Sequence, residues 1–186
     1  MRVTVTLLSY DHGILRQVLD VVGDMAENGT LEQHRSTMPE ISDFFIKFMD
    51  LYHHGREERF VFPVAAEGPD RIKAMIPGLV DDHRKARAYA DAIVADVARW
   101  NPEPLAQNCI DLVAHMRAHV KMEEDFVFPA IEDLIDSDRD LALFERAQIF
   151  VNESFGEDYP AKMEAFANRL QDEVWGKGVM KYPIGK

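Results

Sequence analysis

Two segments of the chain carry the same pattern, a histidine followed four residues later by a glutamate. His53 and Glu57 form the first pair, and His119 and Glu123 form the second, at a constant offset of 66 residues. On an α-helix, positions i and i+4 lie one turn apart on the same face, so an imidazole and a carboxylate can bind one metal ion from a single rigid element. The repeat therefore predicts metal binding at two related places.

An Asp-His dipeptide precedes each of these pairs. Asp11-His12 lies before the first pair and Asp82-His83 before the second, each by about one helix and a connection. The order along the chain is therefore His, His-x-x-x-Glu, His, His-x-x-x-Glu. Two copies of one helical unit are expected to bring these groups together.

Apolar residues recur every three or four positions along the chain, which predicts helices. Four long helices are expected at about residues 7–25, 39–67, 72–100 and 104–135, and two shorter ones at about 138–153 and 160–175. No alternating strand pattern of useful length occurs, so the predicted fold class is all-α. The tail, residues 176–186, holds three glycines and a proline and is expected to be loose.

Glycine and proline mark the ends and the irregular points of these helices. Asn28-Gly29 is expected to stop the first helix, and Pro77-Gly78 to kink the third or mark a false start. Pro63 and Pro129 follow the two His-x-x-x-Glu pairs at matching positions. Each of these prolines is expected to bend or thin its helix just beyond the metal-binding pair.

Helices joined by short connections pack antiparallel, which predicts an up-down-up-down four-helix bundle. Residues 1–136 are expected to form this bundle, and residues 137–186 a C-terminal helical extension packed on the same domain. In the bundle centre, the histidines of the two Asp-His dipeptides can meet the two His-x-x-x-Glu faces. The predicted metal ligands are His12, His53, Glu57, His83, His119 and Glu123.

Four neutral imidazoles and two carboxylates suit iron, and less specifically manganese, zinc or copper. The approximate two-fold repeat favours two metals, one bound by the histidines of each half, with the two glutamates bridging. This count leaves room for an oxo or hydroxo bridge and for an exogenous ligand. We therefore expect two iron ions, with zinc or manganese as alternatives.

The combined pattern resembles that of the hemerythrin-like, or HHE cation-binding, domain family. The resemblance covers about residues 5–135, and the matching segments are His12, His53-His54-x-x-Glu57-Glu58 ending in Phe62-Pro63, Asp82-His83, and His119-x-x-x-Glu123-Glu124 ending in Phe128-Pro129. It implies a four-helix bundle around a non-haem di-iron centre. It also implies that the six predicted ligands are iron ligands.

One position departs from the oxygen-carrying members of that family, which place a second histidine four residues after the histidine of the third helix. Here that position is Arg87. The six-ligand set is closer to hemerythrin-like domains that sense iron or oxygen and to di-iron repair proteins. The resemblance implies a protein that binds, senses or reduces oxygen, peroxide or nitric oxide. It leaves open whether the protein is a carrier, a sensor or an enzyme such as a di-iron peroxidase.

Two other classes of function stay open. One is iron storage of the ferritin type, although ferritin-like bundles use Glu-x-x-His pairs and the nearest pattern here is the unrepeated Asp50-x-x-His53. The other is an interaction module whose metal is structural or regulatory. In that case the two C-terminal helices would form the surface for a homo-oligomer or a protein partner.

The remaining histidines receive other assignments. His115 lies one turn before His119 and is the reserve candidate for a further ligand. His54 follows His53 by about 100° around an α-helix and is assigned to the core or the surface. His34 falls in a probable connection between helices.

Two repeat-matched glutamates and two repeat-matched aromatic residues adjoin the ligands. Glu58 and Glu124 point off the ligand face of an α-helix, and ordinary salt bridges are the favoured interpretation, with orientation of a ligand histidine as the alternative. Phe62 and Phe128 are expected to pack in the core and to wall the site from bulk water.

Charge and cysteine content exclude several classes of protein. The formal net charge of −12 disfavours wrapping of DNA or RNA, because phosphate binding needs clustered Lys and Arg. Cys109 is the single cysteine, which excludes a disulfide framework and a thiolate zinc cluster. No run approaches the ~18 apolar residues of a membrane span. The apolar stretch at the start of the chain is too short for a signal peptide. We expect a cytoplasmic protein without a membrane or nucleic-acid partner.

Overall fold

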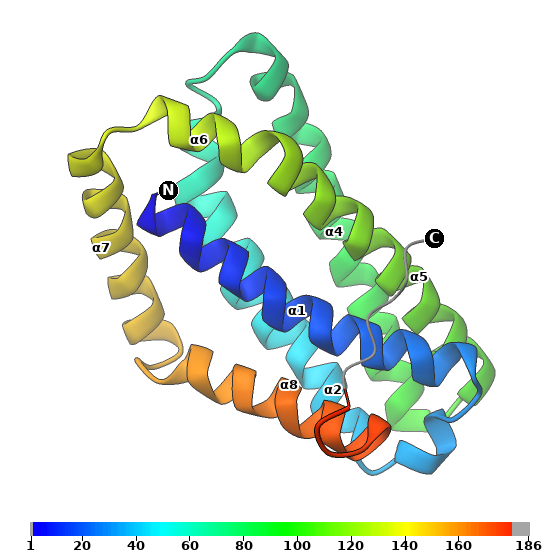
Figure 1. Ribbon diagram of the computed structural model, residues 1–186. Helices are drawn as coiled ribbons and strands as arrows, with labels where there is room; N and C mark the ends of the chain where they lie inside the picture. Colours follow the sequence, from blue (N-terminus) through cyan, green and yellow to red (C-terminus); the bar gives the residue numbers. More distant parts are fainter. Residues whose placement is uncertain (1, 180–186) are drawn as a thin grey trace.

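The computed structural model describes residues 2–179 of the 186-residue chain. All regular elements among these residues are helical, which confirms the all-α prediction (Figure 1). In chain order they are α1 (Val3–Glu27), the 3-10 helix η1 (Leu31–His34), α2 (Met38–Phe44), the π-helical η2 (Phe45–His54) and η3 (Glu57–Val61), α3 (Phe62–Ala65), α4 (Asp70–Arg99), α5 (Pro102–Met122), the π-helical η4 (Glu123–Val127), α6 (Phe128–Leu134), α7 (Ser137–Ser154) and α8 (Tyr159–Trp175). Most of the tail expected to be loose, residues 180–186, lies outside the described residues.

These elements form four long helical rods. The first is α1, the second residues 38–65, the third α4 and the fourth residues 102–134, and the second and fourth each continue without a break through several elements. The rods match the four long helices predicted from the sequence. α1 ends at Glu27 with Asn28 as its C-cap, and Gly29 follows with a left-handed φ of 66°, as the sequence predicts. α4 begins before Pro77 and continues through it, so Pro77 lies inside this helix and marks no false start.

The four rods close into a bundle. α4 packs against α5, α5 against α1, and the α2–η2 segment against α4, while η2 also contacts α1. In Figure 1 these rods lie side by side, with their connections at the two ends of the bundle. The predicted four-helix bundle is therefore present.

α7 and α8 cover one side of this bundle (Figure 1). α8 packs along α1, and its Phe166 ring lies 5.5 Å from the ring of Phe44 in α2. α7 contacts the start of α1, where the backbone N–H groups of Val3 and Thr4 donate to the carboxylate of Asp140 at 2.7 and 3.1 Å. These N–H groups have no partner inside their own helix, so Asp140 fixes the first turn of α1.

Two apolar clusters fill the bundle, and a polar layer separates them. On α1, Leu8 belongs to the smaller cluster and Ile14 to the larger one, with His12 between them. The same order, reversed where a rod runs the other way, occurs on the other three rods. The buried histidines and glutamates therefore lie in one layer that water does not reach.

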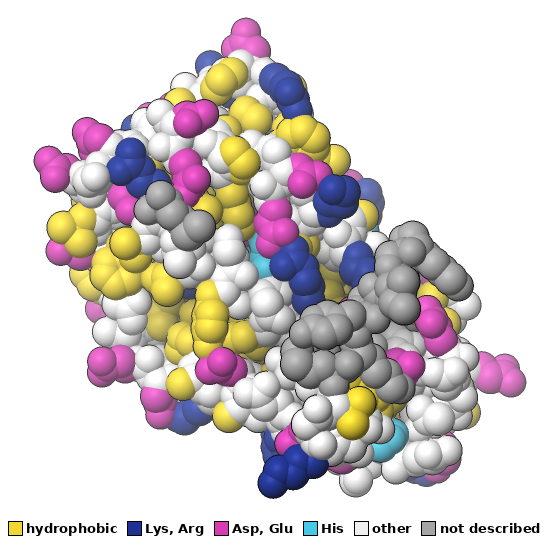
Figure 2. All heavy atoms as spheres, viewed as in Figure 1, with side chains coloured by type: hydrophobic (Ala, Val, Ile, Leu, Met, Phe, Trp, Pro, Cys, Tyr) yellow, Lys and Arg dark blue, Asp and Glu magenta, His cyan; other side chains and the backbone are white. Residues whose placement is uncertain are grey.

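The surface carries a mixture of charged and apolar side chains. Acidic and basic groups are interspersed over the face drawn in Figure 2, and apolar side chains gather near α7. Leu141 and Ile149 of α7 are 54% and 57% exposed. Among residues 2–179, no helix combines the length and the apolar character that crossing a lipid bilayer requires.

Candidate metal centre

Both His-x-x-x-Glu pairs involve π-helical segments: His53 lies inside η2, Glu57 begins η3, and Glu123 begins η4. In the second rod, Pro63 has no N–H to serve the carbonyl four residues before it. The N–H of Phe62 instead donates to the carbonyl of Glu57, five residues back, and Phe128 donates to Glu123 in the same way in the fourth rod. π-Helical turns of this kind are frequent at functional sites. The predicted irregularity beyond each pair is therefore a widened turn that begins at a candidate ligand.

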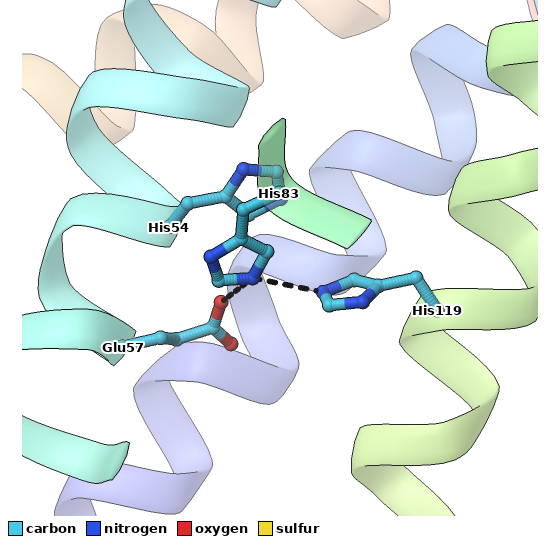
Figure 3. A group of neighbouring side chains, drawn as sticks. All are labelled: His54, Glu57, His83 and His119. Carbon is cyan, nitrogen blue, oxygen red and sulfur yellow. Dashed lines mark hydrogen bonds and ion pairs between the residues drawn. The ribbon is translucent and has the colours of Figure 1, made fainter. Parts of the chain in front are cut away.

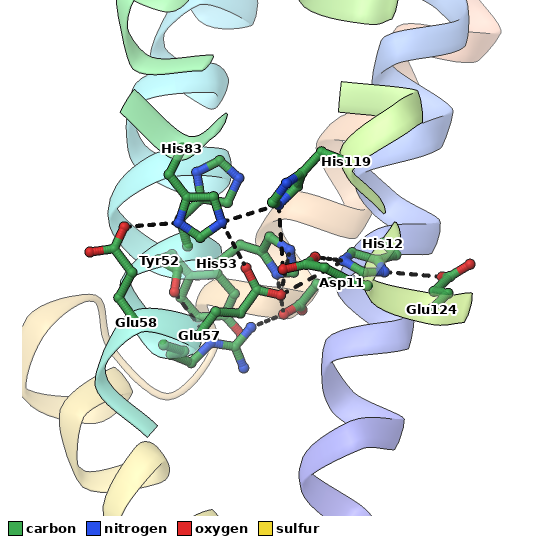
Figure 4. Close-up of polar contacts among 12 residues, drawn as sticks. Asp11, His12, Tyr52, His53, Glu57, Glu58, His83, His119 and Glu124 are labelled. Carbon is green, nitrogen blue, oxygen red and sulfur yellow. Dashed lines mark hydrogen bonds and ion pairs between the residues drawn. The ribbon is translucent and has the colours of Figure 1, made fainter. Parts of the chain in front are cut away.

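The structure brings all six predicted ligands together in the polar layer. Figure 4 labels five of them, all but Glu123, and these five project from four rods toward one point. Each of the six is at most 2% exposed to solvent, and they are His12, His53, Glu57, His83, His119 and Glu123. Side chains separated by more than a hundred residues of sequence thus form one buried cluster.

The cluster has two halves, one with His12 and His53 and the other with His83 and His119. Glu57 lies between them. Its Oε1 is 3.4 Å from Nε2 of His53, and its Oε2 is 3.5 Å from Nε2 of His83. One carboxylate therefore directs an oxygen toward each half. A carboxylate that bridges two metals requires this arrangement.

Glu123 repeats the arrangement from the opposite rod. Its Oε2 is 3.4 Å from Nε2 of His12, and its Oε1 is 3.4 Å from Nε2 of His119. Across the second half, Nε2 of His83 lies 3.1 Å from Nε2 of His119 (Figure 3). Two histidines and two carboxylate oxygens thus surround each of two neighbouring positions.

A fifth histidine, His54, joins the second half. It is fully buried, and its ring stacks on that of His83 with centroids 3.8 Å apart and planes 6° apart (Figure 3). With Glu57, His83 and His119 it offers ligand atoms within 4.8 Å of one another. Its burial confirms the core alternative of its sequence assignment, which missed the donor atoms that His54 offers beside the other ligands.

The reason for the miss is local backbone geometry. The 100° spacing assumes an α-helix, but residues 45–54 are π-helical, and the N–H of Gly55 bonds to the carbonyl of Asp50. A wider turn changes the angle between successive side chains, so His53 and His54 both face inward. The residue at the matching position in the second repeat, Val120, is apolar and 1% exposed. That apolar mate was a signal that the position of His54 faces the core.

Two of the ligand histidines are held by glutamates from the neighbouring repeat. Nδ1 of His12 lies 3.0 Å from Oε1 of Glu124, and Nδ1 of His83 lies 2.8 Å from Oε1 of Glu58. A carboxylate on Nδ1 fixes the tautomer that leaves Nε2 free to bind a metal. The alternative of orienting a ligand histidine therefore applies to both glutamates, and the favoured interpretation as an ordinary salt bridge is confirmed for Glu124 alone, which also pairs with Arg16.

The other two ligand histidines face aspartates. Nδ1 of His53 is 3.4 Å from Oδ2 of Asp11, and Nδ1 of His119 is 4.0 Å from Oδ2 of Asp82. Each aspartate of an Asp-His dipeptide therefore faces the histidine of the following His-x-x-x-Glu pair. A carboxylate oxygen thus lies within 4.0 Å of Nδ1 in all four histidines of the repeat. Figure 4 shows three of these pairs, those of His12, His53 and His83.

The protonation states of the imidazoles suit metal binding. Burial lowers the pKa of the imidazoles of His12 and His53, and burial together with the neighbouring His83 lowers the pKa of His54 and His119 further. These imidazoles are therefore neutral at neutral pH and keep a lone pair for a metal. Burial and the adjacent charge of Glu57 raise the pKa of Glu123 well above its usual value.

Several buried atoms of the layer have no hydrogen-bond partner within the protein. They are Nε2 of His12 and His53, both ring nitrogens of His54, Nδ1 of His119, and both carboxylate oxygens of Glu57 and Glu123. Unpaired buried polar atoms are costly, and two adjacent carboxylates need positive charge nearby. Bound cations satisfy both requirements. The donor set of imidazoles and carboxylates fits iron, and fits manganese or zinc less specifically.

The other predicted candidates lie outside the cluster. Nε2 of His115, the reserve ligand, is 2.8 Å from the carbonyl oxygen of Asp82, so it supports the backbone beside His83. Nδ1 of His34 lies 3.4 Å from Glu173 of α8. Neither belongs to a candidate metal-binding group of the described residues.

Arg87, where the family resemblance would place a further histidine, faces another carboxylate. Its guanidinium donates two hydrogen bonds to Asp50, at 2.7 and 2.8 Å. Oδ1 of Asp50 is in turn 3.8 Å from Nδ1 of His54. Arg87 therefore lies behind His54 and outside the layer of ligands.

Aromatic rings cover the imidazoles, as expected from the sequence. Phe62 stacks on His83 with centroids 5.3 Å apart, and Phe128 stacks on His12 at 5.2 Å. These phenylalanines belong to the smaller apolar cluster. They shield the imidazole faces from water.

The chain belongs to the hemerythrin HHE cation-binding domain family. The family's sequence pattern matches residues 3–131 and, in a second and overlapping match, residues 76–174. The second match begins in α4, so it covers the second copy of the internal repeat, with His83, His119 and Glu123. The buried clusters of histidine and glutamate described above are the place where such a domain can bind cations.

Curated relatives come from mycobacteria. They include the uncharacterized protein Rv1995 of Mycobacterium tuberculosis (strain ATCC 25618 / H37Rv) and the uncharacterized protein Mb2018 of Mycobacterium bovis. Each is 23% identical over 173 residues, which cover 89% of this chain. The match spans 66% of the length of each relative. No solved structure matches the chain.

Proposed function

We propose that the protein is a non-haem di-iron protein that binds, senses or reduces a small oxidant, namely oxygen, peroxide or nitric oxide. The observation that carries this proposal is the pair of glutamates, Glu57 and Glu123, each with one oxygen toward the histidines of either half. This geometry fits two metals that share two carboxylates. Family membership supports a cation at this place, and the mixed donor set favours iron.

The two iron positions are proposed to differ in their histidines. His12 and His53 would hold the first iron, and His54, His83 and His119 the second. Both glutamates would be shared, because Oε1 of Glu123 also lies 3.4 Å from Nε2 of His119. At equal coordination number, the iron with fewer histidines keeps more open positions. We therefore assign binding of the exogenous ligand to the first iron. Iron in such a site supplies electrons to, or a binding position for, the oxidant.

The protein's own residues keep this site dry and oriented. The carboxylates of Asp11, Glu58 and Glu124 hold the imidazoles so that Nε2 points inward. The apolar clusters above and below the layer exclude water. Exclusion of water protects a reactive centre from side reactions.

Metal analysis of anaerobically purified protein tests the proposal. We expect two irons per chain in the wild type and loss of iron in His53→Ala and His119→Ala. His34→Ala is the matched control, because His34 lies outside the cluster, and it should keep both irons. One zinc per chain and no iron would contradict the di-iron proposal.

Mixing the ferrous protein with oxygen or peroxide separates binding from catalysis. A persistent oxy spectrum that clears under vacuum identifies a carrier or a sensor. Repeated turnover of peroxide with an added reductant identifies an enzyme. If neither oxidant nor nitric oxide changes the spectrum of the iron-loaded protein, the proposed function fails.

A further inference from the structure

The predicted ligands are all buried, so a small molecule must cross a wall of protein to reach them. One cavity approaches them between α1, η3 and α7. Its walls include Thr4 and Leu8 of α1, Val61 of η3, and Phe144 and Ala147 of α7. The C-terminal helix α7 therefore forms the outer side of this cavity.

The inner wall of the cavity lies one helical turn from the candidate ligands. Leu8 is four residues before His12, and Val61 is four residues after Glu57. Residues at this spacing lie on the same helix face, about 5.4 Å apart along an α-helix axis. The cavity therefore adjoins the half of the centre that contains His12.

Arg56 closes the inner end of the same cavity. Its side chain is buried, its guanidinium lies 3.9 Å from the centroid of the Tyr52 ring, and it forms an ion pair with Asp11. Asp11 in turn lies 3.4 Å from Nδ1 of His53. A chain of three contacting side chains thus connects the cavity to a candidate ligand of the first iron.

The size and lining of the cavity restrict what it can hold. Its volume is about 20 Å³ for the centre of a water-sized molecule, and one water needs roughly 10–15 Å³ on that measure. A diatomic molecule or a peroxide fits, and a larger organic molecule does not. Most of the lining is apolar, which favours an uncharged molecule such as oxygen or nitric oxide.

A second hollow near the centre has a different character. It is lined by Arg16, Asp20, Arg117, Lys121, Glu124 and Asp125. All of its lining residues carry ionisable side chains, so although their aliphatic stems add apolar surface, its lining is much more polar than that of the first cavity and holds water. The apolar cavity is the better path for an uncharged oxidant.

We infer that the cavity between α1, η3 and α7 is the access and holding site through which an uncharged diatomic oxidant reaches the iron bound by His12 and His53. This inference rests on the proposed function. It gives α7 a role in ligand access.

Filling the cavity tests the inference. Ala147→Phe should slow the association of nitric oxide with the ferrous protein about tenfold or more, which corresponds to a barrier higher by about 1.4 kcal/mol. Phe144→Ala should leave association as fast as in the wild type or faster. Ala142→Phe is the control, because it makes the same change on an exposed part of α7 that does not line the cavity. Iron content is measured for every variant, and association by stopped-flow spectroscopy.

Association in Ala147→Phe within twofold of the wild-type rate, at equal iron content, would overturn the inference. If Ala147→Phe does not fold, crystals of metal-free wild-type protein under xenon pressure decide the question, because apolar cavities bind xenon. Xenon in the cavity supports the inference, and its absence contradicts it. A wild-type protein that holds no iron would instead defeat the proposed function and leave the xenon result interpretable.

Discussion

The two halves of the centre are built from the same sequence pattern, and they differ where the pattern does not supply a ligand. His54 in the first repeat corresponds to Val120 in the second, and both face the core. Arg56, which is buried, corresponds to Met122, which is 41% exposed. The repeat thus holds the metal-binding groups constant while the neighbouring positions make the halves unequal.

The charges behind the ligands differ in the same way. Asp11 is 1% exposed and its partner Arg56 is also buried. Asp82, its counterpart, has a side chain that is 33% exposed, 3.6 Å from the exposed Lys85. The first half therefore has a rigid ionic support next to the cavity, and the second half has a solvated one. Under the proposed di-iron function, this asymmetry gives the two irons different surroundings.

Removal of a shared glutamate should have the largest effect. Glu57→Ala deletes a carboxylate that faces both halves, so we expect the loss of both irons. Elemental analysis after anaerobic reconstitution measures this. His12→Ala is the comparison, since it removes a ligand of the first half alone and should leave the second iron partly bound. A Glu57→Ala protein with one iron at full occupancy would show that the halves bind metal independently.

The two aspartates should differ in their contribution to stability. Asp11→Asn leaves the buried Arg56 without its counter-charge, which should cost about 3–5 kcal/mol of unfolding free energy. Asp82→Asn removes a partly exposed pair and should cost less than about 1 kcal/mol. Urea denaturation of the metal-free variants gives both values. Equal losses would remove the distinction between a rigid and a solvated support.

His54 and Val120 offer a matched test of the extra histidine. His54→Ala should weaken the second iron about 10–100-fold, comparable to or beyond the loss of an orienting carboxylate. Val120→Ala should lower stability through a small cavity and leave iron binding unchanged. Stepwise titration with Fe²⁺ under anaerobic conditions follows the two sites. Identical titrations of His54→Ala and the wild type would return His54 to a packing role.

The smallest effect is expected from two arginines at matching positions, each four residues after the histidine of an Asp-His dipeptide. Arg16 pairs with Glu124, the partner of His12, and Arg87 pairs with Asp50, which adjoins His54. Both arginines are exposed by 40% or more of their side chains, so each contributes less than about 1 kcal/mol. Arg16→Ala should shift the spectrum of the first iron and Arg87→Ala that of the second. Shifts in the opposite order would reverse the assignment of the halves.

The sequence predicts the helices, the bundle and six of the seven inward-facing donors. Those predictions succeed because the helical period and the internal repeat determine which residues share a face. The α-helical period does not predict the direction of the His54 side chain, since π-helical turns change the angle between neighbouring side chains. It also fails for Glu58 and Glu124, whose contacts depend on the rotation of one rod against another. A repeat in sequence indicates a ligand, but the partner of that ligand lies on a different helix.

Anomalous X-ray diffraction at the iron absorption edge, on crystals of the anaerobically reconstituted protein, tests the central claim most directly. We predict two iron peaks per chain, with the glutamates of both repeats between them. One peak should lie beside His12 and His53, and the other beside His54, His83 and His119. A single peak, or two peaks with His54 away from both, would contradict the unequal di-iron centre.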